Sequence, residues 1–429
     1  MNTLSADHGT PEELVTRVAL ALNNAGRHVR APSAAPTFSH HLLPHGASGA
    51  VEAAARYLPA DTDLGIGGDW FDVMPLSGAR VAFVVGEVPG HGINATATAA
   101  GLRTAVHMLA DMDLTPSELL TCLDDTIRRV TEEGAETPEQ ASAARGATCL
   151  YAVYDPVTRR CAMARAGHPS PAIIDPQGRV TFPDLPDRGS LGLGLERVPF
   201  DTVELELPEG SLLAFYTDGL VTSPDQDTAV GMQRLGAALA QPGRSLEDLC
   251  ASVIENLPAR APSDDVTLLL VRTHTLNPAQ VTSWDLPTEP AAVPAARHAV
   301  ARQLGAWGLE HLVSTMELIV SELVTNAIRY GTGPIRLRLI RHQALTCEVF
   351  DADNHCPRLR HARNVDEHGR GLCLIAQLSR RWGFRAVTGG KLVWVEQDLP
   401  STPSRAYDPY SPGCSVRGGC GRGIQVSAA

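Results

Sequence analysis

The stretch Val84-Val85-Gly86-Glu87-Val88-Pro89-Gly90-His91-Gly92 ends an apolar run in a carboxylate and continues into a loop with two further glycines. The apolar residues from Val81 to Val85 predict a buried strand. Because glycine has no Cβ, the chain can bend toward an ion here and present both the Glu87 carboxylate and a main-chain carbonyl, such as that of Val88. A plain turn with a solvated carboxylate has the same local pattern. The stretch therefore indicates a cation site only if other acids converge on it.

Three other carboxylates stand beside glycine, serine or another acid near predicted strands. They are Asp69 in Gly67-Gly68-Asp69-Trp70-Phe71-Asp72, Asp218 in Tyr216-Thr217-Asp218-Gly219, and Asp264 in Ser263-Asp264-Asp265-Val266-Thr267. Each of them alone is typical of a turn. Together with Glu87, they would repel one another at a sheet edge unless cations neutralised them, which favours a Mg²⁺ or Mn²⁺ site. Two such ions about 4 Å apart can hold a phosphoryl group for in-line attack without a protein nucleophile.

Length and charge narrow the class of protein. The 429 residues correspond to two or three domains of about 150 residues each. Thirty-six Lys and Arg against 48 Asp and Glu give a net charge of -12, which argues against a general binder of nucleic acid or anionic membranes. No apolar run approaches the roughly 20 residues of a membrane span, and no cationic start precedes an apolar core as in a secretory signal. We therefore expect a cytoplasmic protein without direct nucleic-acid or membrane contacts.

Residues 37–273 alternate apolar strands with amphipathic helices, which predicts two sheets with covering helices. Strands are expected at 81–85, 149–154, 161–166, 172–174, 203–207, 212–216 and 266–271, and helices at 93–111, 116–130, 230–240 and 246–257. The sequence Asp155-Pro156-Val157-Thr158 predicts a hairpin between two of these strands. A break rich in Pro, Ala and Ser separates this region from a short helix expected in residues 1–36.

A polar segment without helical period, residues 274–283, predicts a linker to a second α/β unit over residues 284–399. In this unit we expect a strand near Trp284, helices at 293–307, 310–330 and 372–380, and strands at 335–340, 345–350, 382–387 and 392–397. Gly, Ser and Pro dominate residues 400–429, so this tail is expected to be disordered. The expected fold class is therefore α/β (α+β), with two unequal α/β units.

The first unit resembles the SpoIIE-type branch of the PPM metal-dependent serine/threonine phosphatases. The matching motifs include Gly67-Gly68-Asp69-Trp70-Phe71-Asp72-Val73, Gly86-Glu87-Val88-Pro89-Gly90-His91-Gly92, Ala166-Gly167-His168-Pro169, Phe215-Tyr216-Thr217-Asp218-Gly219-Leu220 and Asp264-Asp265-Val266-Thr267. The resemblance implies an α-β-β-α sandwich in which four catalytic acids bind two Mn²⁺ or Mg²⁺ ions, namely Asp69, Glu87, Asp218 and Asp264. It also implies a phosphoserine substrate on an anti-sigma-factor antagonist. The family has Asp where this chain has Glu87, and a carboxylate displaced by about 1 Å can lower the rate about 100-fold.

The helix expected over residues 310–330 carries Glu322 and Asn326 four residues apart on one face. An acid and an amide placed in this way can hold Mg²⁺ and a water against phosphates, although a solvated helix face has the same pattern. Downstream, Asp351 ends a strand, where its carboxylate can accept a hydrogen bond from an adenine amine. The sequence Gly369-Arg370-Gly371-Leu372 then opens a helix, whose first amides suit a phosphate.

These pieces, in this order, resemble the GHKL ATPase/kinase superfamily, most closely the anti-sigma-factor serine kinases, from Trp284 to about Leu399. The resemblance implies a smaller Bergerat-type α/β sandwich that binds Mg-ATP. Its site residues would be Glu322 as base or orienter of a water, Asn326 as the Mg²⁺ ligand, Asp351 as the adenine contact, and Gly369, Arg370 and Gly371 at the phosphates.

Two functions remain open at this point. The chain is expected to be a bifunctional partner-switching regulator, with a phosphatase acting on a phosphorylated STAS-type antagonist and a kinase-like domain that binds ATP. Alternatively, it is a binding module for a sigma factor or an antagonist, with a phosphatase weakened by Glu87. A homodimer is compatible with both. Mn²⁺-dependent hydrolysis of an aryl phosphate distinguishes the two functions.

Overall fold

Strand β3 (Val81–Glu87) is buried from Val81 to Gly86. Its alternate side chains enter two different cores: Ala82 and Val84 face one, and Phe83 and Val85 face the other. A strand with apolar side chains on both faces must be covered on both sides. The computed structural model describes residues 49–60, 67–132, 144–194, 198–222, 227–241, 243–256, 264–353 and 371–399. In this model, other elements of the first domain pack against both faces of β3.

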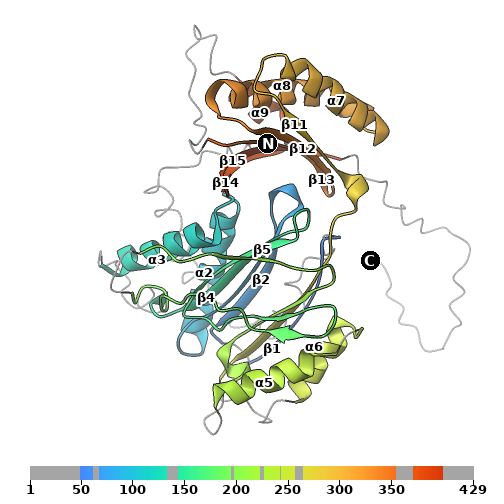
Figure 1. Ribbon diagram of the computed structural model, residues 1–429. Helices are drawn as coiled ribbons and strands as arrows, with labels where there is room; N and C mark the ends of the chain where they lie inside the picture. Colours follow the sequence, from blue (N-terminus) through green and yellow to red (C-terminus); the bar gives the residue numbers. More distant parts are fainter. Residues whose placement is uncertain are drawn as a thin grey trace, which may run out of the picture. The chain divides into compact units, whose positions relative to one another are not determined.

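Two five-stranded antiparallel sheets form the centre of the first domain (Figure 1). The first has the order β2-β3-β4-β5-β8, with β2 (Asp69–Pro75), β4 (Thr148–Asp155), β5 (Arg160–Ala166) and β8 (Val203–Glu206). The second has the order β1-β10-β9-β6-β7, with β1 (Val51–Leu58), β10 (Val266–Thr273), β9 (Leu212–Tyr216), β6 (Ala172–Ile174) and β7 (Val180–Thr181). Phe83 and Phe215 meet between the sheets, with ring centroids 5.6 Å apart.

Helices cover the outer face of each sheet. The first sheet packs against α2 (Ile93–Ala110) and α3 (Pro116–Glu132), which contribute Leu102, Leu109, Leu119 and Leu123 to a shared core. The second sheet packs against α5 (Thr228–Leu239) and α6 (Leu246–Glu255) through residues such as Leu235 and Leu249. The resulting layers are α-β-β-α, which confirms the sandwich expected from the sequence.

The second domain is an antiparallel sheet with helices on one face (Figure 1). Its strand order is β11-β12-β13-β15-β14, with β11 (Val281–Leu286), β12 (Ile335–Arg341), β13 (Ala344–Asp351), β15 (Gly390–Asp398) and β14 (Arg381–Val387). The helices are α7 (Ala292–Ala306), α8 (Val313–Tyr330) and α9 (Gly371–Leu378). Helix α8 buries Met316, Ile319, Val320, Leu323, Val324 and Ala327, as its apolar spacing predicts.

Several elements differ from the sequence-based expectation. Strand β1 was not predicted, because the composition of Val51–Leu58 is rich in Ala; its pairing with β10 makes it a strand. The helix expected over 310–330 begins as a 3-10 turn, η4 (Glu310–Leu312), before α8. The segment expected as a linker contains the 3-10 turn η3 (Pro278–Gln280) and the first residues of β11. The helix expected within residues 1–36 and the tail expected over 400–429 lie outside the described residues.

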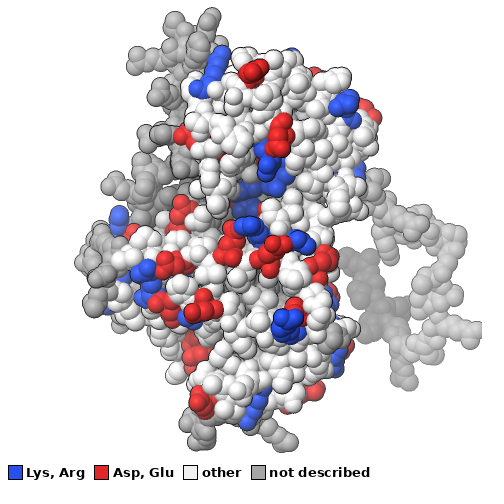
Figure 2. All heavy atoms as spheres, in the orientation of Figure 1, with Lys and Arg blue, Asp and Glu red and all other residues white. Residues whose placement is uncertain are grey.

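Charges of both signs are interspersed on the face of the molecule shown in Figure 2. Within the described ranges, no helix combines the length and apolarity needed to cross a bilayer.

Candidate metal centre and nucleotide site

Two sheet edges bring the four predicted acids of the first domain together. Asp69 is the first residue of β2 and Glu87 is the last of β3, and the two are paired in the antiparallel register. Asp218 begins the 3-10 turn η2 (Asp218–Leu220), directly after β9, and Asp264 lies just before β10. Since β9 and β10 are antiparallel neighbours, the end of one and the start of the other lie at the same edge of the sheet.

Three of the four carboxylates form a tight cluster. One oxygen from each of Glu87, Asp218 and Asp264 lies within 4.8 Å of the other two. Asp69 is turned toward the neighbouring strand: its Oδ2 accepts a hydrogen bond from Thr217 Oγ1 at 2.7 Å, while its Oδ1 is buried without a hydrogen-bond partner. The geometry thus places Asp69 beside the other three acids rather than among them.

Burial raises the pKa values of two of these carboxyl groups, and the charges of the neighbouring acids raise them further. Burial, followed by the charges of Asp218, Asp69 and Asp264, raises the pKa of Glu87 to about 9. Burial also raises the pKa of Asp69 to about 7, and Asp265 and Asp264 add to the effect. A divalent cation would remove this repulsion, and carboxylate oxygens are the ligands that Mg²⁺ and Mn²⁺ prefer. The cluster and the unpartnered Asp69 oxygen therefore fit such ions, and the longer Glu87 side chain still reaches the cluster.

Close backbone contacts hold the loops that carry the acids. The N–H of Val88 donates to the Gly68 carbonyl at 3.1 Å, and a Cβ at Gly68 would overlap the Val88 carbonyl oxygen. A Cβ at Gly219 would likewise overlap the Asp265 carbonyl oxygen. Glycine is thus required at both positions by close approach of the main chain. The Val88 carbonyl, expected from the sequence as a metal ligand, lies over the Gly68 backbone beside Asp69.

The two acids adjacent to predicted ligands have different surroundings. Asp265 accepts hydrogen bonds from the N–H groups of Ala60 and Gly68, each at 2.9 Å, so it fixes the backbone just before Asp69. Asp72 lies toward α2, where it accepts from Arg103 at 2.7 Å and contacts His107 at 2.5 Å. Asp72 therefore ties α2 to β2.

A pocket of about 330 Å³ opens beside the cluster. Its lining includes two acids of the cluster, Glu87 and Asp218, together with Arg165, His168, Pro169, Tyr216, Val221 and Met232. The Arg165 guanidinium donates to the carbonyls of Leu185 and His168 at 2.9 and 3.0 Å. No sequence motif marked Arg165, because its place in the pocket depends on the bend of the chain after β5.

His168, part of the Ala-Gly-His-Pro motif, is a buried structural residue. Its Nδ1 lies 2.8 Å from Thr148 Oγ1, and Thr148 is paired with Glu87 across β3 and β4. Burial lowers the pKa of His168 to about 3, so its ring is neutral at pH 7. His91, the other histidine of the quoted motifs, is exposed in the loop after Glu87.

In the second domain, the predicted adenine contact is a buried carboxylate with a lysine partner. Asp351 ends β13, and its Oδ1 accepts from Lys391 Nζ at 2.8 Å and from the Asp353 N–H at 3.0 Å. A Cβ at Gly331, which follows α8, would lie 2.7 Å from the Asp351 Cγ. The end of α8 therefore lies against the end of β13. Lys391, which no spacing argument singled out, holds Asp351 in place.

Of the residues predicted to lie near the ATP phosphates and Mg²⁺, the structure describes Glu322, Asn326 and Gly371. A Cβ at Gly371, the first residue of α9, would overlap the Glu322 carboxylate, so Glu322 lies directly against the start of that helix. Asn326 is half-buried on α8, one turn after Glu322. Gly369 and Arg370 lie outside the described residues. The structure thus brings together Glu322 and Gly371, and it places Asn326 nearer to the Asp351 end of α8.

Comparisons with known protein families identify both parts of the chain. Residues 77–274 match the family model for stage II sporulation protein E (SpoIIE), a match that begins after Asp69. Residues 286–396 match the model for the histidine kinase-like ATPase domain.

Solved structures of similar proteins include the RsbU and RsbW domains of Rv1364c from Mycobacterium tuberculosis, 25% identical over 82% of this chain and 95% of that chain, with a TM-score of 0.47. RsbX in complex with magnesium is 20% identical over 53% of this chain and 97% of that chain, with a TM-score of 0.40. The PP2C phosphatase domain of SpoIIE from Bacillus subtilis, with a fragment of its regulatory domain, is 16% identical over 53% and 64%, with a TM-score of 0.43.

Proposed function

Because the chain carries a SpoIIE-type phosphatase domain followed by a histidine kinase-like ATPase domain, we propose that it is a bifunctional partner-switching regulator. The first domain hydrolyses phosphoserine on a protein, and the second binds Mg-ATP. The observation that carries the phosphatase assignment is the cluster of Glu87, Asp218 and Asp264 within 4.8 Å, with a buried oxygen of Asp69 beside it.

These four acids would hold two Mn²⁺ or Mg²⁺ ions. When bound, such ions lower the pKa of an attacking water and neutralise charge on the phosphoryl oxygens. The chain's own residues supply the positions: Thr217 orients the Asp69 carboxylate through its hydroxyl, and Asp265 fixes the loop before Asp69. No side chain of the cluster needs to act as a nucleophile.

The pocket beside the cluster is the proposed place for the protein segment that carries the phosphoserine. Two of its walls, Glu87 and Asp218, belong to the metal cluster, so a segment lying there presents its phosphoryl group to the ions. We propose a phosphorylated anti-sigma-factor antagonist of the STAS type as this substrate, and a cytoplasmic location for the reaction. The pairing of a phosphatase domain with a kinase-like domain in one chain supports a substrate that cycles between phosphorylated and free forms.

In the second domain, Asp351 is proposed to receive the adenine amine, with Lys391 holding one of its oxygens. Asn326 would be a ligand of Mg²⁺, Glu322 would orient a water or accept a proton, and the Gly369-Arg370-Gly371 segment would contact the phosphates. The domain would then either phosphorylate the antagonist or bind a sigma factor. Self-association as a homodimer is part of the same proposal.

The test is hydrolysis of p-nitrophenyl phosphate and of a phosphoserine antagonist at fixed Mn²⁺. We expect turnover by the wild-type chain and a loss of at least about 100-fold in Asp218→Asn and Asp264→Asn, in line with displaced catalytic geometry. Asp201→Asn is the matched control, because Asp201 is an exposed acid paired with Arg188 at 2.8 Å. If the wild-type chain shows no turnover with Mn²⁺ and Glu87→Asp restores none, the binding-module function replaces the enzymatic one.

A further inference from the structure

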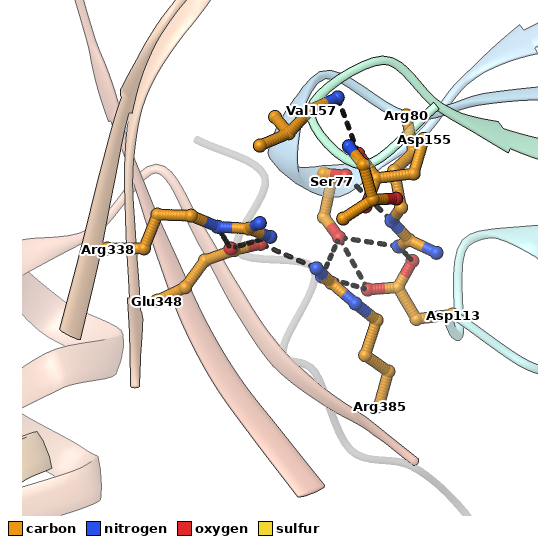
Figure 3. A network of polar contacts seen from close by, with 9 residues as sticks. Ser77, Arg80, Asp113, Asp155, Val157, Arg338, Glu348 and Arg385 are labelled. Atoms are coloured by element: carbon orange, nitrogen blue, oxygen red, sulfur yellow. Dashed lines mark hydrogen bonds and ion pairs between the residues drawn. The ribbon is translucent and has the colours of Figure 1, made fainter. Parts of the chain in front are cut away.

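A buried network of polar and charged side chains connects the two domains (Figure 3). Its members come from both parts of the chain: Ser77, Arg80 and Asp113 from the first domain, and Arg338, Glu348 and Arg385 from the second. We call these six residues the interdomain network. None of them belongs to the metal cluster or to the predicted nucleotide site.

Arg385 is the residue that joins the two halves of the network. Its guanidinium donates to Glu348 at 2.5 Å and to the Ser77 hydroxyl at 3.0 Å, and it lies 3.9 Å from Asp113. The Ser77 hydroxyl in turn donates to Asp113 at 2.6 Å. Glu348 therefore holds Arg385 from its own domain, and Ser77 and Asp113 hold it from the other domain.

The two central members of the network, Arg385 and Glu348, are almost inaccessible to solvent. Arg385 is 6% exposed and Glu348 is 1% exposed. A buried charge that loses its partner is strongly unfavourable, so these contacts form or separate together. The backbones also approach closely, because a Cβ at Gly78 would lie 2.6 Å from the Glu348 carboxylate. The contact therefore acts as one cooperative unit.

On the phosphatase side, the network lies at the far end of the hairpin that carries two of the metal acids. Ser77 and Arg80 are in the turn between β2 and β3, whereas Asp69 and Glu87 form the pair at the open end. The two strands, each of seven residues, span roughly 20 Å as a paired ribbon. The hairpin thus connects the turn that carries Ser77 and Arg80 directly to the two metal acids at its open end.

On the ATPase side, the network lies on the strands that carry the predicted adenine contact. Glu348 and Asp351 are on β13. Arg385 on β14 is paired with Leu392 of β15, next to Lys391, the partner of Asp351. Arg385 and Glu348 therefore lie in the same sheet as the predicted adenine contact and its lysine partner.

We propose that Arg385 is a positioning residue through which nucleotide bound to the second domain alters the geometry of the metal centre in the first. This inference rests on the proposed function of both sites. The coupling is reciprocal for binding free energies, so metal in the first domain changes nucleotide affinity by the same factor as nucleotide changes metal affinity.

The first experiment measures hydrogen-deuterium exchange of the full chain at constant Mg²⁺, with and without ATP, and needs no phosphatase activity. In the wild type, ATP should change the exchange of amides in residues 69–87. Ser77→Ala removes the hydroxyl that accepts hydrogen bonds from Arg385 and Arg80 and donates one to Asp113. This variant should abolish the change, and so should Arg385→Ala. Arg336→Ala is the control, because Arg336 is an exposed arginine of the same sheet whose partner is Asp285. The change should persist in that variant.

The second experiment follows kcat and KM for p-nitrophenyl phosphate at fixed free Mn²⁺, with and without ATP. We expect ATP to change kcat/KM at least about 5-fold, the lower end of typical couplings, and this factor to fall to about 1 in Ser77→Ala. ATP binding, measured by calorimetry, separates the possible failures. If ATP binds while exchange and kinetics stay unchanged, the coupling is refuted and the proposed functions stand; if ATP does not bind, the nucleotide site and the coupling are both refuted. An unaltered ATP effect in both network variants also refutes the role of Arg385.

Discussion

Replacing Glu87 with glutamine should stabilise the metal-free protein. In the folded chain, burial and then the neighbouring acids raise the pKa of Glu87 from its ordinary value of 4.5 to about 9. At pH 7 the folded state must therefore keep a proton that the unfolded chain releases. The interval from pH 4.5 to 7, at 1.36 kcal/mol per pH unit, corresponds to a cost of about 3 kcal/mol. A glutamine side chain at this position carries no charge in either state, so the Glu87→Gln variant avoids this cost.

The sign of the pH dependence follows from the same two pKa values. Between pH 7 and 8 the folded wild type binds about one proton more than the unfolded chain, so its free energy of unfolding should fall by about 1.4 kcal/mol over this interval. The interval from pH 7 to 8 lies above the ordinary pKa of histidine, about 6.5, and at or above the pKa of Asp69, about 7. These groups therefore contribute less to the slope in this interval than Glu87 does. Glu87→Gln should therefore remove most of the slope.

The assay is native-state hydrogen exchange of β3 amides in urea with EDTA, at pH 7 and pH 8. Glu247→Gln is the control, because Glu247 is exposed and its ion pair with Arg56 should contribute less than about 1 kcal/mol. Adding Mn²⁺ at about 100 times its dissociation constant should stabilise the wild type by about 2.7 kcal/mol and the variant by less. A variant that is less stable in EDTA, or that keeps the wild-type slope, would show that Glu87 is ionised in the folded protein and would refute the reasoning.

Three further results are expected. Gly68→Ala places a Cβ against the Val88 carbonyl oxygen and should therefore destabilise the first domain by about 1–3 kcal/mol. Mn²⁺-dependent hydrolysis should fall, whereas ATP affinity measured by calorimetry should stay unchanged. Normal hydrolysis by this variant would contradict the close approach of the two backbones. Asp351→Asn should weaken ATP binding at least about tenfold, as the loss of one charged hydrogen bond implies. Phosphatase activity in the absence of nucleotide should stay unchanged. An ATP affinity equal to that of the wild type would show that Asp351 does not contact the nucleotide. Lys391→Met leaves the buried Asp351 carboxylate without its charged partner and should lower the stability of the second domain by about 3–5 kcal/mol in urea denaturation, whereas the matched Arg336→Met at the exposed pair with Asp285 should have little effect.

Most elements of the fold could be predicted from local patterns. The apolar run before Glu87 is a strand, the pair of strands around Asp155 is a hairpin, and the spacing of Met316, Ile319 and Leu323 matches the buried side of α8. Strand β1 could not be found in this way, since nothing in its local composition favours a strand, and its conformation comes from pairing with β10. The 3-10 turn that precedes α8 was not predicted either, because helix periodicity does not reveal the exact first turn.

Three acids of the metal centre, Glu87, Asp218 and Asp264, were recognisable because each stands where a clearly apolar strand meets a turn, and Asp69 was recognisable from the glycines that precede it. The sequence by itself thus determined the types of ligand and the strands that carry them. Which oxygens meet was decided only by the tertiary structure: Glu87, Asp218 and Asp264 cluster, whereas Asp69 turns toward Thr217. The tertiary structure alone also brings together the network around Arg385. Ser77 and Arg385 are 308 residues apart, and no local sequence pattern predicts a contact between side chains so distant in the chain. Burial strengthens the attraction between these charged side chains because the protein interior has a lower dielectric constant than water. Burial in turn depends on how the whole chain folds.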